Sequence, residues 1–345
     1  MNNGACGTRI PPRRHSRRTF HFLLLTSYLL PPIKHCIFHG RWYNLRTAVN
    51  ESRKAFVAAV IAAVLMGVLG VFVKESHCSA QTCSMVRFSI GLFLVVPVFA
   101  LRRKGKAFSL PAAVSGVGIS LCILFYFQAI QGLSVGIAAL LPATGPLFAA
   151  AGEALVQRRM PPWKNGLLML AAAAGIVLVC APGICGGGQL EYYAYGLLSG
   201  LCYGVYILLN RLIPDKVKNL QRAFWQFVAG VVVLAVPFAM QENPFRGAET
   251  GWPYLICIGV FQGYMVMLLA AYAMKHMSAI RYGTVAYLEP TVAVALGWVV
   301  YSDHLQPLQW LGVVMVLVCS VCQSLLPNQA AAPPQDTEKQ PGAGV

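Results

Sequence analysis

Charged residues are scarce in this sequence. They make up 11% of its 345 residues, and 57% are hydrophobic, whereas a typical soluble domain carries roughly 25% charged residues. Two motifs are missing as well. The sequence contains no GxxxxGK[ST] phosphate loop and no HExxH zinc motif, which ATP-driven transport and zinc-dependent hydrolysis need. The shortage of charge argues against a soluble domain, and the missing motifs favour a chain that is not an enzyme.

Metal-site spacing is absent too. The eleven cysteines are scattered along the chain without the paired spacing of metal ligands, so we predict no metal site and no cofactor. Cys319 and Cys322 have CxxC spacing, but within an apolar run we expect them to pack as small residues. Cys78, Cys83 and Cys185 fall in loops that we expect on the outer side, and a disulfide among them is one alternative.

Long apolar runs account for the shortage of charge. A helix that crosses a bilayer needs about 20 predominantly apolar residues, and we find about ten such runs joined by short loops. They are residues 55–73, 82–101, 108–127, 134–156, 163–181, 192–212, 223–240, 253–274, 283–301 and 308–326. We therefore predict an all-α integral membrane protein with ten transmembrane helices.

The basic residues alternate between loops. The net charge is +16, but bases concentrate in every second loop, as in residues 102–106 and 216–222, while the loops between them are mostly acidic. This is the positive-inside pattern of a multi-pass membrane protein. It places both termini in the cytoplasm and makes the lipid bilayer a better explanation of the charge than nucleic acid. We expect a bacterial inner membrane, and the arginine-rich N-terminal segment leaves an organellar membrane as the alternative.

Both ends of the chain differ from its middle. Residues 1–53 contain eight arginines and no acidic residue before Glu51, and we expect a disordered leader or an extension from a start codon placed too early. A targeting segment and a flexible arm on an anionic membrane surface remain alternatives. Residues 327–345 are rich in alanine, proline and glutamine, which predicts a disordered cytoplasmic tail.

The ten runs form two copies of one half-molecule, at residues 55–182 and 192–326. Shifting the sequence by 144 residues places Pro146 on Pro290, and Ser134 and Ala149 on matching residues. Five spans in each copy would turn the second copy upside down relative to the first. Inverted repeats are typical of secondary transporters, whose binding sites lie where the repeats meet.

Glu289 is the strongest candidate for a functional residue. It lies near the middle of an apolar run, where an ionised side chain costs at least a few kcal/mol unless it faces a cavity or a partner. Pro290 follows directly and disfavours helical geometry at Glu289. We expect further helix breaks at Pro142 and Pro146. Glu289 could bind a cation, an amine or a proton, or could be a protonated acid that joins two helices.

A second tier of candidates surrounds this acid. Arg87 lies within the second run, where it could extend to the membrane surface or point inward to hold Glu289 or a substrate carboxylate. Tyr203, Gln262 and Tyr287 lie deep in other runs, where each polar tip needs a partner. One acidic wall and one neutral wall would suit an amphoteric or weakly cationic organic solute.

Several short runs of residues carry a resemblance to a known family. They include Arg87-Phe88, Leu133-Ser134, the run Leu288-Glu289-Pro290, the turn Ser302-Asp303 and the segment Gln309-Trp310-Leu311-Gly312. With these, residues 55–326 resemble the EamA-type permeases of the drug/metabolite transporter superfamily. The resemblance implies ten helices around a central cavity that opens alternately to each side. Met66 stands where the family often has tryptophan, and Ser302 where it usually has glycine.

The sequence leaves two classes of function open. One is a secondary carrier of a small organic solute, coupled to protons or working by exchange. We expect export of an amino acid or related metabolite, with multidrug export as the alternative. The other class is a non-transporting membrane scaffold or sensor on a carrier fold, because fold alone does not fix function. The direction of transport and the presence of a homodimer are also left open.

Overall fold

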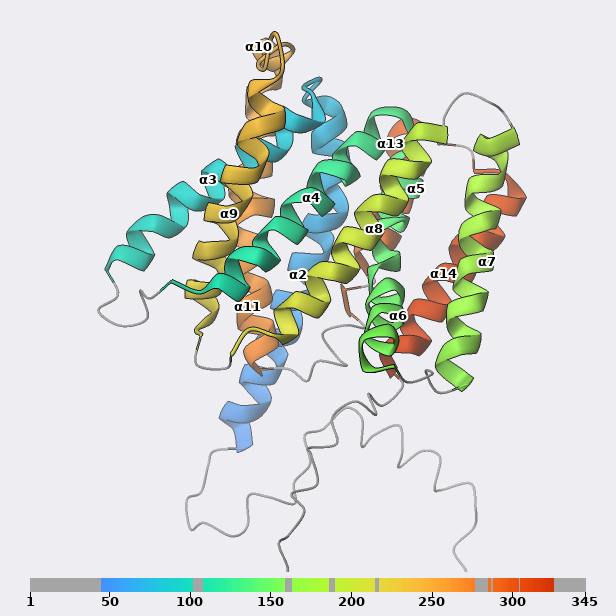
Figure 1. Cartoon of the computed structure of the whole chain (residues 1–345), viewed down its shortest axis with the longest axis horizontal. Coiled ribbons are helices and arrows are strands. Elements are labelled where there is room, and N and C mark those ends of the chain that lie inside the picture. The colour runs from blue at the N-terminus through green and yellow to red at the C-terminus, as the bar shows by residue number, and fades with distance from the viewer. Residues whose placement is uncertain are drawn as a thin grey trace, which may run out of the picture. The chain divides into compact units, whose positions relative to one another are not determined.

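A computed structural model of the chain describes residues 45–101, 108–158, 163–185, 190–214, 217–276, 285–286, 288–303 and 305–325. The chain divides into two compact units, Met1–Glu51 and Ser52–Val345. The second unit is a bundle of helices (Figure 1). In chain order the helical segments are α2 (Leu45–Glu75), α3 (Ala80–Ala100), α4 (Leu110–Gly132), α5 (Val135–Leu140), the 3₁₀ turn η2 (Pro142–Thr144), α6 (Gly145–Gln157), α7 (Trp163–Cys185), α8 (Leu190–Arg211), α9 (Asn219–Ala239), α10 (Ala248–Cys257), the π-helix η3 (Ile258–Met265), α11 (Val266–His276), α13 (Leu288–Tyr301) and α14 (Pro307–Leu325).

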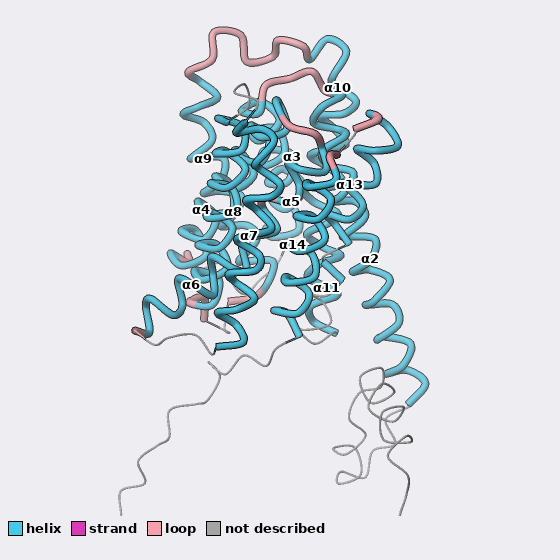
Figure 2. Tube along the Cα trace, turned by 90° about the vertical axis from the view of Figure 1, so that its right-hand side faces the viewer, coloured by secondary structure: helices cyan, strands magenta, loops and turns pink. Residues whose placement is uncertain are grey.

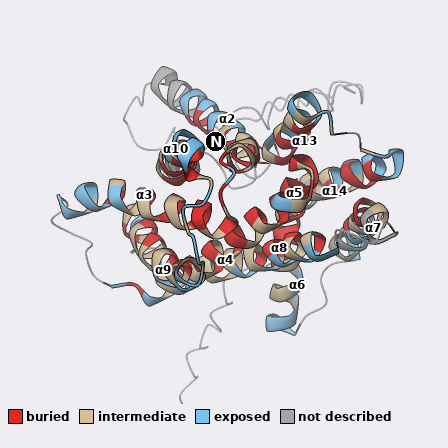
Figure 3. Cartoon of the chain, turned by 90° about the horizontal axis from the view of Figure 1, so that it is seen from above, coloured by how far each residue is buried: buried red, intermediate tan, exposed pale blue. Residues whose placement is uncertain are grey.

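Each of the ten apolar runs contains a helix, and the described residues form helices joined by short loops (Figure 2). Seven of the helical stretches in this part of the chain are long and apolar enough to cross a membrane. Three more, Gly166–Pro182, Leu288–Tyr301 and Pro307–Cys319, are apolar but shorter. Buried side chains gather on the helix sides that face the middle of the bundle (Figure 3).

Three helices differ from their predicted form. Helix α2 begins at Leu45, inside the expected leader, because residues 45–54 contain no proline or glycine to stop it. The run at 134–156 is divided into α5, η2 and α6, with the predicted break at Pro142. The run at 253–274 contains the π-helix η3, which hydrophobicity alone does not indicate.

Corresponding turns in the two halves adopt the same unusual backbone conformation. Arg158, after α6, has φ 50°, and Ser302, after α13, has φ 53°. The two residues are 144 positions apart, the same shift that aligns the sequence repeats. Left-handed geometry is uncommon for residues other than glycine, so its occurrence at both positions supports the duplication that the sequence indicated.

The two halves also pack on each other through reciprocal contacts. Phe88 of α3 and Phe227 of α9 meet edge to face, with ring centroids 5.7 Å apart. Each ring lies over a glycine of the other helix, Phe88 over Gly230 and Phe227 over Gly91, where a β-carbon would clash. Helices α3 and α9 therefore approach closely at a site where each contributes one aromatic ring and one glycine.

A polar contact joins the halves at the end of the bundle that holds the turn at residues 76–79. The Tyr301 hydroxyl of α13 donates to Glu75 Oε1 of α2 at 2.7 Å. Lys74 Nζ lies 4.3 Å from the centroid of the Tyr301 ring, within the range of a cation–π interaction. These contacts hold the ends of α2 and α13 together.

The expectation of a disulfide among loop cysteines is corrected for two residues. Cys83 lies in α3 instead of a loop, and both Cys78 and Cys83 are free thiols. Burial raises the pKa of the Cys78 thiol above its ordinary value, which lowers its reactivity. Cys185 is the last residue of α7.

One serine fits a hydrolase pattern by spacing alone. Ser134 is the centre of a GxSxG run, which in hydrolases marks a nucleophile at a strand-to-helix turn. Here it lies between helices α4 and α5, and its hydroxyl accepts a hydrogen bond from the Ile137 amide at 3.4 Å. Ser134 thus acts as a helix cap.

Candidate functional site

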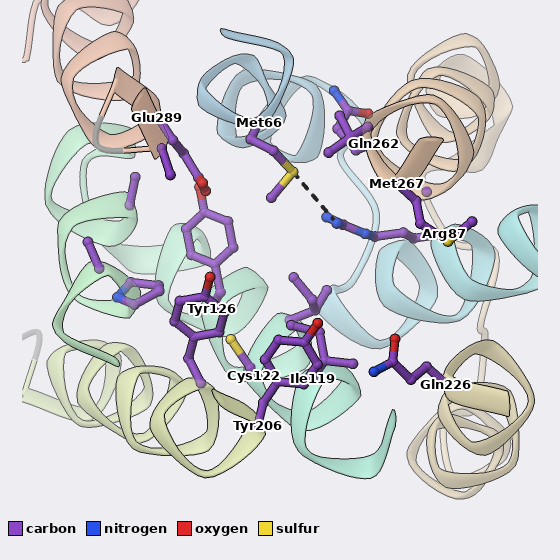
Figure 4. A pocket seen from close by; sticks show the side chains of 18 of the residues that line it. Met66, Arg87, Ile119, Cys122, Tyr126, Tyr206, Gln226, Gln262, Met267 and Glu289 are labelled. Carbon is purple, nitrogen blue, oxygen red and sulfur yellow. Dashed lines mark hydrogen bonds between the residues drawn. The ribbon is translucent and has the colours of Figure 1, made fainter. Parts of the chain in front are cut away.

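A cavity of about 370 Å³ lies between the two halves of the bundle. Its wall includes residues of both halves, mostly apolar, with a few polar groups from separate helices (Figure 4). The lining residues are Met66, Arg87, Phe88, Ile119, Cys122, Ile123, Tyr126, Ala139, Pro142, Ala143, Pro146, Tyr203, Tyr206, Ala223, Gln226, Phe227, Gln262, Gly263, Val266, Met267, Ala286, Glu289 and Pro290. This size and this mixture of apolar wall and convergent polar groups are typical of small-molecule sites.

The structure brings most of the predicted site residues to this cavity. The charged and polar candidates Arg87, Glu289, Tyr203 and Gln262 all line it, as do the three predicted helix-break prolines, Pro142, Pro146 and Pro290. Tyr287 lies outside the described residues. Of the described residues that line the cavity, Arg87 and Glu289 are the two with acidic or basic side chains.

Arg87 is a buried cation in the first half of α3. Only 8% of the residue is exposed. Its Nη2 lies 3.7 Å from Met66 Sδ, a weak acceptor, and its Nη1 has no hydrogen-bond partner among the described residues. Gly263 of η3 packs directly on the Arg87 backbone, where a β-carbon would lie 2.8 Å from the carbonyl oxygen. A rigid backbone thus presents a guanidinium whose Nη1 is available for a hydrogen bond.

Glu289 enters the cavity from the opposite half. It lies in the first turn of α13, where Pro290 is tolerated because the first amides of a helix need no internal partner. Within the predicted run at 283–301, the structure describes helical residues 285–286 and 288–301. Figure 4 shows Glu289 pointing toward Tyr126 of α4, whose buried hydroxyl has no hydrogen-bond partner among the described residues.

Gln262 supplies a third unused polar atom. It is 1% exposed and lies in the π-helix η3, a form of helix that is frequent at functional sites. Its Nε2 donates to the Leu65 carbonyl of α2 at 3.3 Å, which fixes the side chain, while its Oε1 has no partner among the described residues. Since buried polar groups are normally paired, Arg87 Nη1, Tyr126 Oη and Gln262 Oε1 together indicate a polar ligand.

The sequence did not single out every polar residue of the cavity. Tyr126 and Gln226 lie in apolar runs of adequate hydrophobicity, and nothing in their local pattern tells which side of the helix faces the bundle. A second, weaker repeat gave the available signal: a shift of 139 residues aligns Arg87 with Gln226. Equivalent positions in two repeats tend to face the same interface. The described residues contain no group of three His, Cys, Asp or Glu side chains placed to hold a metal ion.

The sequence pattern of the EamA-like transporter family matches residues 53–181 and again residues 190–324. The chain belongs to the EamA-like transporter family. It is therefore a multi-pass membrane transporter of the drug/metabolite transporter superfamily and not an enzyme, as the sequence predicted. The two matches coincide with the two halves described above.

The relatives of this chain include a transporter and two exporters. An uncharacterized transporter of Archaeoglobus fulgidus is 27% identical over 75% of this chain and 92% of its own length. The pseudopaline exporter CntI of Pseudomonas aeruginosa is 22% identical over 79% of this chain and 96% of its own. The threonine/homoserine exporter RhtA of Escherichia coli is 22% identical over 71% of this chain and 82% of its own. A crystal structure of another protein, 15% identical, covers 79% of this chain and 97% of its own with a TM-score of 0.57, which is a likeness of fold.

Proposed function

We propose that the protein is a secondary carrier that exports a small amphoteric solute, such as an amino acid or a related metabolite, by alternating access. The observation that carries the proposal is the pair of oppositely charged side chains, Arg87 and Glu289, on different walls of one cavity. A solute with both a carboxylate and an ammonium group would complement them. The exporters of threonine/homoserine and of pseudopaline among its relatives support this class of solute.

The unused polar atoms give each end of such a solute a partner. A carboxylate bound to Arg87 would accept a hydrogen bond from Nη1, and hydrogen bonds between charged groups are the stronger ones. Gln262 Oε1, on another part of the wall, offers an acceptor to a donor group of the solute. The remaining wall, which includes Met66, Ile119 and Val266, offers apolar surface to a small side chain.

Glu289 also suits proton coupling. A carboxyl group in the first turn of α13, beside a cavity, can bind a proton from one side and release it on the other when the cavity changes its opening. Exchange of one solute for another would use the same residue for binding alone. The Tyr301–Glu75 contact at the 76–79 end supports a state in which that end is closed.

We further propose ten membrane crossings in two inverted repeats, with both termini in the cytoplasm of a cell whose inner membrane holds the protein. The alternation of basic and acidic loops supports this orientation, and the reciprocal packing of α3 and α9 supports an inverted pair of repeats. In this orientation the 76–79 end faces outward and the end with the turn at residues 212–218 faces the cytoplasm.

The test is solute flux in proteoliposomes that contain the purified protein. Pooled labelled amino acids and common metabolites would be assayed with and without a pH gradient. Saturable flux accelerated by the gradient is the expected result. Flux that requires solute on both sides would assign exchange, and the absence of flux from folded protein would favour a multidrug substrate or a non-transporting scaffold.

A further inference from the structure

A second polar cluster lies next to the cavity, toward the end of the bundle with the 212–218 turn. Gln226 of α9 donates through Nε2 to Ser115 Oγ of α4 at 2.9 Å and to Asn210 Oδ1 of α8 at 3.2 Å. Asn210 Nδ2 in turn donates to the Tyr206 carbonyl at 3.0 Å. Gln226 and Tyr206 also line the cavity, so this cluster continues the cavity wall toward that end.

Arg222 belongs to this cluster by its place on α9. It lies four residues before Gln226 and therefore one turn away on the same face of the helix. Its Nε is buried and has no hydrogen-bond partner among the described residues, and its charge acts on the phenol of Tyr206. Arg222 is half-buried, and an arginine that lies wholly at the membrane surface would keep Nε in water as well.

The neighbours of Arg222 in the sequence lie in two different surroundings. The next residue, Ala223, lines the cavity. On the side of the 212–218 turn, Ala112, Ile213 and Val217 form a separate apolar cluster with Trp225 packed against it. Arg222 thus lies one turn inside the start of α9 and directly before a cavity residue, so a solute that approaches from this end would meet it before Arg87.

We propose that Arg222, with Asn210, Ser115 and Gln226 around it, forms a carboxylate-binding subsite at the entrance of the cavity from the 212–218 end. A guanidinium is the side chain best suited to a carboxylate, because its planar donors match two oxygens. The subsite binds the carboxylate of a solute first and passes it to Arg87. This inference rests on the proposed function for its role in transport, but binding by the subsite can be tested without flux.

The experiment measures how fast phenylglyoxal modifies individual arginines in the full-length protein, read peptide by peptide with mass spectrometry. The probes are acetate, glutarate and L-threonine, each compared with sodium chloride at the same ionic strength. We expect at least one carboxylate to slow modification of Arg222 by about tenfold at about ten times its dissociation constant. Arg246, which is exposed near the opposite end of the bundle, should react at an unchanged rate.

Two variants sharpen the assay. Gln226→Leu removes both hydrogen bonds that Gln226 donates and should weaken the protection of Arg222 severalfold. Lys218→Gln removes one positive charge from an exposed residue one turn from Arg222 and should leave the protection of Arg222 unchanged. Equal rates with every carboxylate and with chloride would overturn the proposal.

Two comparisons separate this inference from the proposed function: carboxylate added on one or the other side of the membrane, and protection of Arg222 against protection of Arg87. In sealed vesicles of one orientation, protection of Arg222 should appear only when the carboxylate is on the side of the 212–218 end. Protection of Arg87 without protection of Arg222 would support the central site and reject the subsite. Protection of Arg222 in a protein that carries no amino acid would keep the subsite and reject the proposed solute.

Discussion

Each half of the molecule has a dipeptide that ends in proline, called the junction below, at the same place in the repeat. The two junctions carry different side chains. In the first half the junction is Gly145-Pro146, and in the second it is Glu289-Pro290, 144 residues later. Each packs its carbonyl against a glycine on the first helix of the other half. A β-carbon on Gly204 would lie 2.9 Å from the Gly145 oxygen, and one on Gly67 would lie 2.8 Å from the Glu289 oxygen.

The side chains at the two junctions differ where the backbones agree. At Gly145 the missing side chain leaves room for the ring of Tyr203, which packs directly on the glycine. At Glu289 the side chain is a carboxyl group that points into the cavity (Figure 4). The comparison suggests that the duplicated backbone secures close helix packing in both halves, whereas the second half alone adds an acid to the site.

The largest effect is expected when the carboxyl group of Glu289, which has no counterpart at Gly145, is removed. In Glu289→Gln we expect pH-driven flux to fall to the level of protein-free liposomes, because the amide cannot carry a proton. Exchange of solute should persist with a raised KM, because the ammonium group loses its charged partner. The measurement is initial flux with and without a pH gradient at equal protein content. Glu242→Gln, at an exposed acid, is the matched control, and normal pH-driven flux in Glu289→Gln would remove this residue from the coupling mechanism.

A smaller loss is expected at the opposite wall. Arg87→Gln should raise the KM for carboxylate-bearing solutes by about 10- to 150-fold, since a hydrogen bond to a charged group contributes about 1.5–3 kcal/mol. Arg87→Lys should lose part of this, because lysine lacks the planar pair of donors. Concentration dependence of flux would be compared for an amino acid and its amide. An equal loss for both compounds would indicate a structural role for Arg87.

The shared backbone contact can be tested with a pair of glycine substitutions. Gly67→Ala and Gly204→Ala should each destabilise the protein by about 1–3 kcal/mol, because the new methyl group meets a backbone carbonyl that cannot rotate away. Thermal unfolding in detergent measures both. Only Gly67→Ala should also alter pH-driven flux, since it displaces Glu289. Equal effects of the two variants on flux would show that the junctions are functionally equivalent after all.

The smallest effect is expected at the paired turns after α6 and α13. Ser302→Gly and Arg158→Gly should each stabilise the fold by about 0.5–1 kcal/mol, because glycine adopts positive φ without the strain that other residues incur. Chemical denaturation at constant detergent concentration would detect the change. Ser302→Ala serves as the control and should bring no gain. A loss of stability in Ser302→Gly would mean that its side chain makes a contact worth more than the strain.

Much of this architecture could be predicted because the length and hydrophobicity of membrane helices can be recognised in the sequence. The apolar runs predicted every helix of the bundle, and Pro142 predicted the break between α5 and α6. The gathering of Arg87, Glu289, Tyr203 and Gln262 around one cavity agrees with the expectation that costly polar groups avoid lipid, while their roles in binding stay predictions. The role of Tyr287 stays a prediction as well.

Other features depend on tertiary packing, which produces no periodic pattern of residue types in the sequence. Hydrophobicity does not distinguish a π-helix from an α-helix, so the register shift that positions Gln262 was not predictable. Tyr126 faces the cavity because α4 packs on α8 and α9, which the composition of α4 does not specify. The placement of α13 similarly depends on its contacts with α2 and α5.

The contact between Gly67 and the Glu289 carbonyl has a consequence for biogenesis. Its two partners are separated by more than 200 residues of chain, so during synthesis α2 leaves the ribosome long before α13 exists. Until then Gly67 lacks the two residues of α13, Val292 and Glu289, that cover it in the complete fold, whereas Gly70 can already pack on Val135 of the first half. We expect the first half alone to insert into a membrane without acquiring its final packing, and the cavity to form only when the second half has been inserted.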